Sequence, residues 1–91
     1  MNTTQTDTTT EALAYHITRN VIGCQVEVVS ETRLVARDDE DSPKVVISVS
    51  DAEAQSMTLT LCTPNGVILG EAHISGMSER TVSGFVASML R

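Results

Sequence analysis

Apolar and polar residues alternate along most of the middle of the chain. From residue 24 to residue 74 the pattern repeats every two residues, which is typical of β-strands with one buried face. The cleanest run is SMTLTLC, in which Met57, Leu59 and Leu61 alternate with Ser and Thr. Four other runs place apolar residues at Val26 and Val28, at Leu34 and Ala36, at Val45, Ile47 and Val49, and at Ile68, Ala72 and Ile74. The pattern therefore predicts five strands.

The segments between these runs are short, so strands that follow one another in sequence are expected to be antiparallel neighbours. TPNGV is the strongest turn signal, because Pro64 fixes φ, Asn65 tolerates the bridge conformation and Gly66 supplies a positive φ. SE at 30–31 and DAEAQ at 51–55 are weaker signals. The sequence thus predicts a five-stranded antiparallel meander.

Near the N-terminus, apolar residues recur at a spacing of four: Leu13, Ile17 and Val21. Thr8 and Glu11 form a capping-box pattern ahead of them, and these signals together predict an amphipathic helix over about 9–22. The preceding residues 1–9 contain no apolar residue after Met1. We expect them to form a disordered leader.

At the C-terminal end, Ser78 is a suitable N-cap, and Met77 before it can meet Val82 as a hydrophobic staple. The stripe that follows has helical spacing: Val82, Phe85, Val86, Met89 and Leu90. The economical arrangement packs both helices on one face of the meander. The predicted fold is a two-layer α+β domain over residues 10–91.

Composition narrows the function classes. The 91 residues suffice for one small domain, and a hydrophobic share of 41% is typical of a folded chain. Tyr15 and Phe85 are the only aromatic residues, so base stacking is an unlikely means of binding nucleic acid. Twelve acids and six bases give a net charge of −6, which repels phosphate backbones. We therefore expect no direct binding to nucleic acid.

No stretch approaches the roughly 18 consecutive apolar residues of a membrane span, and the polar N-terminus does not resemble a targeting segment. We expect a soluble, cytoplasmic protein without a membrane partner. In that compartment Cys24 and Cys62 are expected to be reduced thiols rather than a disulfide.

The most acidic stretch is RDDEDSP at 37–43. It lacks the glycine and the alternating acids of a calcium loop, so the interpretation is a solvated turn and not a metal site. Successive turns of a meander lie at alternate ends of the sheet. Four acids would then form a negative tip at one end, and acids of other turns would charge the opposite end. Acidic ends favour a basic protein partner, which the tip would contact through Asp38, Asp39, Glu40 and Asp41.

Catalytic signatures are weak. His16, His73, Cys24 and Cys62 lack the close pairing of zinc ligands, and no G-x-S-x-G elbow or phosphate-binding glycine loop is present. We therefore predict no metal, no cofactor and no enzyme activity. The competing hypothesis is a small-ligand or metal-dependent catalyst that uses His73, Glu71 and Cys62.

Alternation also predicts which side chains lie on the sheet face away from the helices. The apolar ones are Val29, Val35, Val46, Val67 and Leu69, and the polar ones include Arg33, Arg37, Thr58, Thr60 and His73. A mixed face of this kind can bind a partner or a second copy, although scattered valines are also normal in strands. The predicted contacts on this face are Val35, Val46, Leu69 and His73.

These observations lead to one functional hypothesis. The chain is predicted to be a small acidic, non-enzymatic protein-binding module that acts as a regulator, inhibitor or assembly subunit, and to form a homodimer. It would dock through the outer sheet face or the acidic turn on a basic partner, including the nucleic-acid groove of another protein. A structural homo-oligomer held by sheet faces or edges is the alternative.

Overall fold

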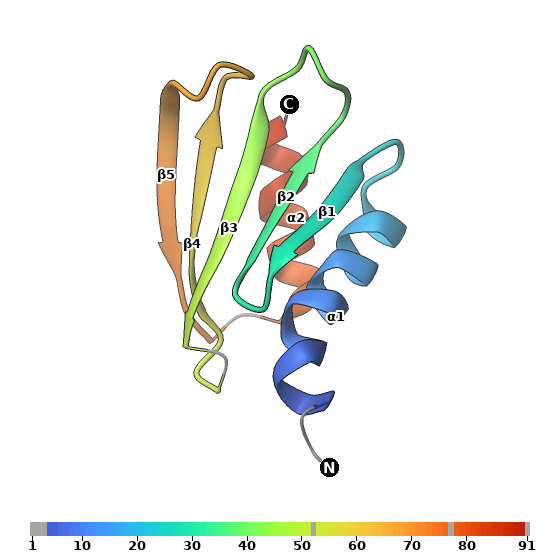
Figure 1. Cartoon of the computed structure of the whole chain (residues 1–91), viewed down its shortest axis with the longest axis vertical. Coiled ribbons are helices and arrows are strands. Elements are labelled where there is room, and N and C mark those ends of the chain that lie inside the picture. Colours follow the sequence, from blue (N-terminus) through green and yellow to red (C-terminus); the bar gives the residue numbers. More distant parts are fainter. Residues whose placement is uncertain (1–3, 52, 77, 91) are drawn as a thin grey trace.

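In the computed structural model, which describes residues 4–51, 53–76 and 78–90, a helix from each end of the chain packs on one antiparallel sheet (Figure 1). The elements are α1 (Thr4–Asn20), β1 (Gln25–Ser30), β2 (Arg33–Arg37), β3 (Lys44–Asp51), β4 (Ser56–Cys62), β5 (Ile68–Ile74) and α2 (Glu79–Leu90). The spatial order of the strands is their chain order, and each neighbouring pair is antiparallel. The predicted α+β meander is confirmed.

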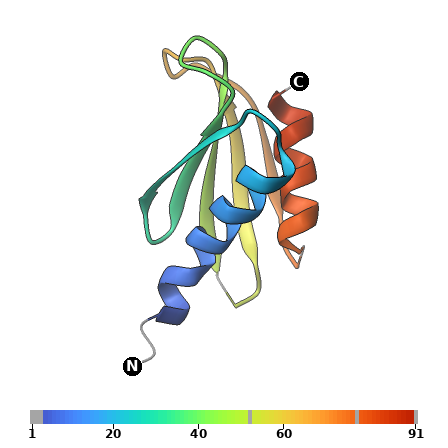
Figure 2. The same ribbon diagram turned by 90° about the vertical axis from the view of Figure 1, so that its right-hand side faces the viewer.

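The core lies between the helices and one face of the sheet. Leu34, Ile47 and Leu59 stand opposite one another on the three central strands, and all three are fully buried. The helices contribute their own buried stripes: Leu13, Ile17 and Val21 from α1, and Val82 and Val86 from α2. Figure 2 shows both helices on the same side of the sheet, with α1 against β1 and β2 and α2 against β3 and β4.

Only one of the two helices begins where its capping signal predicts. Ser78 caps α2 as predicted, because its Oγ accepts a hydrogen bond from the Thr81 backbone N–H at 3.3 Å. Met77, the predicted staple partner of Val82, lies outside the described residues. By contrast, α1 starts at Thr4, so the Thr8 capping-box pattern lies inside the helix rather than at its start. Since neither glycine nor proline interrupts residues 4–9, nothing stops helical hydrogen bonding there.

The TPNGV turn forms as predicted. The Gly66 N–H donates to the Thr63 carbonyl at 2.9 Å, the Thr63 N–H donates to the Val67 carbonyl at 2.9 Å, and Gly66 has φ +95. At the opposite end, Asp51 organises the β3–β4 turn, because its Oδ1 accepts hydrogen bonds from the N–H groups of Glu53 and Ala54. Turns therefore alternate between the two ends of the sheet, as Figure 1 shows.

The start of β5 differs from the prediction. Alternation placed Ile68 on the helix side with Ala72 and Ile74, but Ile68 is 63% exposed. The cause is an irregular step in the β4–β5 register: Leu61 pairs with Gly70, whereas the next residue, Cys62, pairs with Ile68. One extra residue in β5 reverses the alternation beyond it. Ile68 is consequently exposed, like its neighbours Val67 and Leu69, which alternation places on the outer face.

Two isoleucine substitutions test this placement of the core. Ile47→Ala removes a fully buried side chain from the central strand, so the free energy of unfolding should fall by about 2–5 kcal/mol. Ile68→Ala, a matched change at an exposed strand residue, should alter it by less than about 0.5 kcal/mol. Urea denaturation followed by circular dichroism measures both values. Equal losses for the two variants would contradict the placement.

Candidate functional site

The sheet face opposite the helices is covered by no other element of the described chain, and two valines lie at its centre. Val35 of β2 and Val46 of β3 are directly opposite one another, and each is half-buried. The same cross-strand row continues to Glu27 on β1 and to Thr60 and Glu71 on β4 and β5. The prediction that Val35 and Val46 lie away from the helices is confirmed.

Positive charge gathers beside these valines. Arg33, Arg37 and Lys44 lie on the same face, so this surface carries three of the six lysines and arginines of an acidic chain. Arg37 and Lys44 are direct cross-strand partners, an arrangement of like charges that destabilises a sheet. Over the described residues, the side chains that lie within ion-pair distance of a carboxylate are those of His16 and His73, so none of these three bases has a carboxylate partner.

The other half of the face is neutral or mixed. On β5, His73 Nε2 lies 3.5 Å from Glu71 Oε1, and both side chains are well exposed. Each also reaches β4: His73 Nδ1 is 2.9 Å from Thr58 Oγ1, and Thr60 Oγ1 donates to Glu71 Oε2 at 3.4 Å. These contacts fix His73 and Glu71 along the open edge of the sheet.

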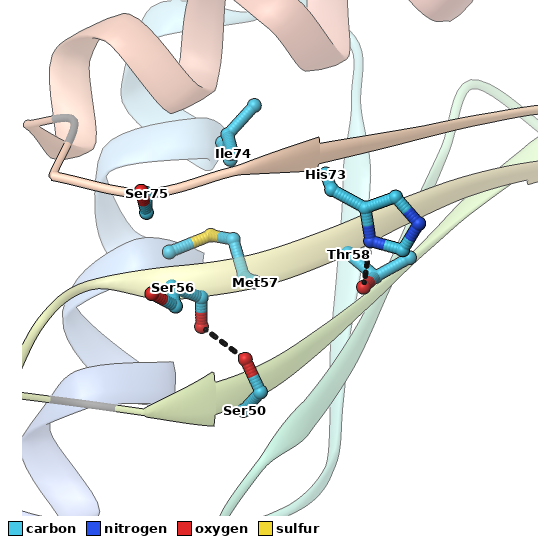
Figure 3. A pocket seen from close by; sticks show the side chains of 7 residues that line it. All are labelled: Ser50, Ser56, Met57, Thr58, His73, Ile74 and Ser75. Atoms are coloured by element: carbon cyan, nitrogen blue, oxygen red, sulfur yellow. Dashed lines mark hydrogen bonds between the residues drawn. The ribbon is translucent and has the colours of Figure 1, made fainter.

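A shallow, open depression of about 210 Å³ lies beside His73 (Figure 3). Its lining consists of Ser50, Ser56, Met57, Thr58, His73, Ile74 and Ser75. The Ser50 hydroxyl donates to the Ser56 carbonyl at 3.1 Å, and Ile74 points away from His73 toward α2. Ligand pockets usually enclose most of the molecule that they bind, which this open surface does not do.

The catalytic set considered from the sequence is only partly assembled. His73 and Glu71 are adjacent, but neither Glu71 nor Cys62 lines the depression. Cys62 is buried opposite Lys44 and Ile68, and its thiol is directed to the Thr60 carbonyl at 3.9 Å. Among the described residues, no group of three histidine, cysteine or acidic side chains could hold a metal ion.

The acidic run forms the connection between β2 and β3. Asp38, Asp39, Glu40 and Asp41 are all exposed. Asp39 shapes the turn, because its Oδ1 accepts a hydrogen bond from the Asp41 N–H at 2.8 Å and its carbonyl accepts one from the Ser42 N–H at 3.3 Å. The predicted turn is confirmed, and it places the negative tip directly beyond Arg37 and Lys44.

The other predicted contacts are spread out. Leu69 lies at the irregular step of β5 and is 55% exposed, with β4 between it and the two central valines. Val29 falls at the irregular step of β1, and Val67 precedes β5. The structure therefore brings together Val35 and Val46 but not the whole predicted apolar set.

Sequence reasoning did not identify Lys44 as part of this surface or its position opposite Arg37. A signal was present, because the two bases flank the acidic turn and a hairpin places flanking residues side by side. The pairing of Glu71 with His73 was also foreseeable, since residues two apart in a strand share a face.

Both cysteines are unpaired and buried. Burial raises the pKa of the Cys24 thiol above its ordinary value, the nearby Asp38 carboxylate raises it further, and a hydrogen bond with the Arg37 backbone lowers it. The Cys24 thiol is therefore neutral at pH 7 and is a poor nucleophile.

Comparisons with models of protein families, with curated proteins and with solved structures give no match to this chain. None of the described helices is both long enough and apolar enough to cross a membrane.

The state of Cys24 predicts a pH effect. Because its pKa is higher in the folded chain, the folded state binds the thiol proton more tightly than the unfolded state does. The free energy of unfolding should therefore fall as the pH rises above about 8.5, the ordinary thiol value. Urea denaturation from pH 7 to pH 10 should show a steeper loss for the native chain than for Cys24→Ala. Parallel curves for the two proteins would refute the assignment.

Proposed function

We propose that the protein is a small, non-enzymatic protein-binding module that docks through the outer face of its sheet. The surface is defined by Val35 and Val46 at its centre and by Arg33, Arg37 and Lys44 around them. Its partner would supply apolar side chains for the valines and carboxylates for the bases. The observation that carries this proposal is the Arg37–Lys44 pair, aligned across β2 and β3, for which the described residues show no carboxylate within ion-pair distance.

In the unbound chain, Arg37 and Lys44 are unfavourably placed. Two cations held opposite one another on a sheet repel. The chain has six more acids than lysines and arginines, but over the described residues no carboxylate contacts either cation. A partner carboxylate placed between Arg37 and Lys44 would convert this repulsion into two charge-assisted hydrogen bonds. Binding would then stabilise a feature that is unfavourable in the free chain.

Shape and polarity support the same surface. Both helices pack on the opposite face, so the outer face is free over the described strands. Half-buried valines surrounded by hydroxyl and charged side chains resemble a protein interface, with an apolar centre and a polar rim. The depression beside His73 is lined by none of these residues, and it is too open to enclose a small substrate.

The acidic turn would act as a second contact at the end of this surface. Arg37 and Lys44 form the base of the β2–β3 hairpin, and Asp38–Asp41 form its tip. A partner that crosses both would present carboxylates to the sheet and a basic patch to the tip. Such an arrangement of opposite charges fixes the orientation of docking and accelerates association.

A charge-reversal experiment tests the surface. The partner is first identified by a photo-reactive residue placed at Val46 in the source cells, and its affinity for purified variants is then measured. Arg37→Glu combined with Lys44→Glu should weaken binding by about 10- to 100-fold, because both contacts become repulsive. Arg19→Glu combined with Arg80→Glu makes the same change in net charge on the helices and should leave the affinity unchanged.

The contribution of the acidic tip is measured in the same binding experiment. Replacing Asp38, Asp39, Glu40 and Asp41 by their amides should reduce the affinity less than the sheet-face reversal does. If the sheet-face variant binds normally and only the amide variant fails, the turn is the docking site and the proposal is wrong. Failure to crosslink any protein at Val46 would also count against it.

A further inference from the structure

The sheet is open at two edges, β1 and β5. An edge strand presents unpaired backbone N–H and C=O groups, and proteins usually shield such an edge with lysine, proline or a covering element. α1 packs against β1, whereas α2 packs against β3 and β4 and leaves the β5 edge uncovered (Figure 1). Both edge strands lack lysine and proline, and each has one irregular step, so the covering helix is what distinguishes them. β5 is therefore the less protected edge.

The regular part of β5 has a defined centre. Gly70 to Ile74 pair with β4 without interruption, and the irregular step lies beyond Gly70. This segment of five residues is centred on Ala72. Any strand added to the outer side of β5 would use this segment, because a bulge disrupts further pairing.

The side chains on either side of Ala72 are complementary, because one is a carboxylate and the other an imidazole that can donate a hydrogen bond to it. Glu71 and His73 flank Ala72, lie on the outer face and have side chains that are 48% and 74% exposed. Suppose that a second copy pairs antiparallel to β5 with its helices on the same side of the sheet. Residues opposite one another then share a face, so one residue must lie opposite its own copy. The two-fold axis passes between these two copies, and it is named below by that residue. An axis at Glu71 opposes two glutamates, and an axis at His73 opposes two histidines. An axis at Gly70 extends the pairing into the irregular step.

Only the axis at Ala72 places unlike groups together. Glu71 of each copy then lies opposite His73 of the second copy, and this contact occurs twice. On the helix side, Ala72 faces Ala72 and the small Gly70 faces the larger Ile74, so no bulky side chains collide there. Residues directly opposite in an antiparallel pair are close enough for such side chains to interact.

We propose that two copies of this chain associate through β5 in this register and form one continuous sheet, to which each copy contributes its five strands. Each outer-face row would run from Thr58 through His73 to Glu71 and Thr60 of the second copy. The β4 hydroxyls already hold both side chains in position. The dimer leaves Val35, Val46 and their basic neighbours free, so it is independent of the docking surface proposed above.

A charge-swap cycle tests the pairing, with sedimentation velocity as the readout over chain concentrations up to about 1 mM. The unmodified chain should dimerise. His73→Glu should weaken dimerisation at least about 10-fold, because it opposes two carboxylates at both contacts. Glu71→Lys should also weaken it, because lysine offers no acceptor to the opposite His73. The combined variant should recover to within about 3-fold of the unmodified chain, since it restores both unlike pairs. Glu27→Lys, on the opposite edge of the sheet, should have no effect.

Three results would overturn the proposal: an unmodified chain that stays monomeric throughout, a combined variant as weak as the single ones, or equal weakening by Glu27→Lys. Circular dichroism checks the folding of every variant. Should a charge variant unfold, Glu71→Gln and His73→Gln replace it and should weaken the dimer without repulsion.

The register has its own test. Ala72→Cys places two thiols opposite one another across the axis and should give a dimer-linking disulfide under mild oxidation. Ser75→Cys lies off the axis, so it should crosslink far less. Crosslinking of Ser75→Cys in preference to Ala72→Cys would exclude this register.

Discussion

The structure depends on the burial of one face of one sheet. Leu34, Ile47 and Leu59 form an apolar row across the three central strands, and both helices pack onto that side. Within the part of the chain that the structure describes, no further element covers the second face of the sheet. Because the hydrophobic effect scales with the apolar area removed from water, this single layer contact supplies most of the stabilisation. The surfaces that stay open for binding are those that this contact does not cover.

The outer face and the β5 edge are the two regions that the helices leave open. On the outer face, the pairing of Arg37 with Lys44 creates a repulsion that a partner carboxylate would relieve. At the edge, Glu71 and His73 are held by β4 threonines on either side of Ala72. The two regions involve different strands, so one can serve docking and the other self-association. This separation makes each role testable without disturbing the other.

The sequence predicts the fold well because alternation, turn residues and helical spacing all agree. SMTLTLC, TPNGV and the Ser78 cap are examples in which the local pattern determines the local structure. The sequence predicts the structure less well where a shift of one residue in strand pairing changes the face on which a side chain lies. Ile68 was assigned to the core, but the irregular step in β5 exposes it. The site is predicted least well, because it depends on how the strands pair and not on any one segment. Examples are the position of Arg37 opposite Lys44 and the separation of Leu69 from Val46.

Packing of the helices is confined to one face of the sheet, and two adjacent valines on β3 test this arrangement directly. Val45 is fully buried toward the helices, whereas Val46 is half-buried on the outer face. A water-soluble paramagnetic agent added to dilute protein should attenuate the methyl signals of Val46 much more than those of Val45. Equal attenuation of the two valines, or stronger attenuation of Val45, would contradict the account.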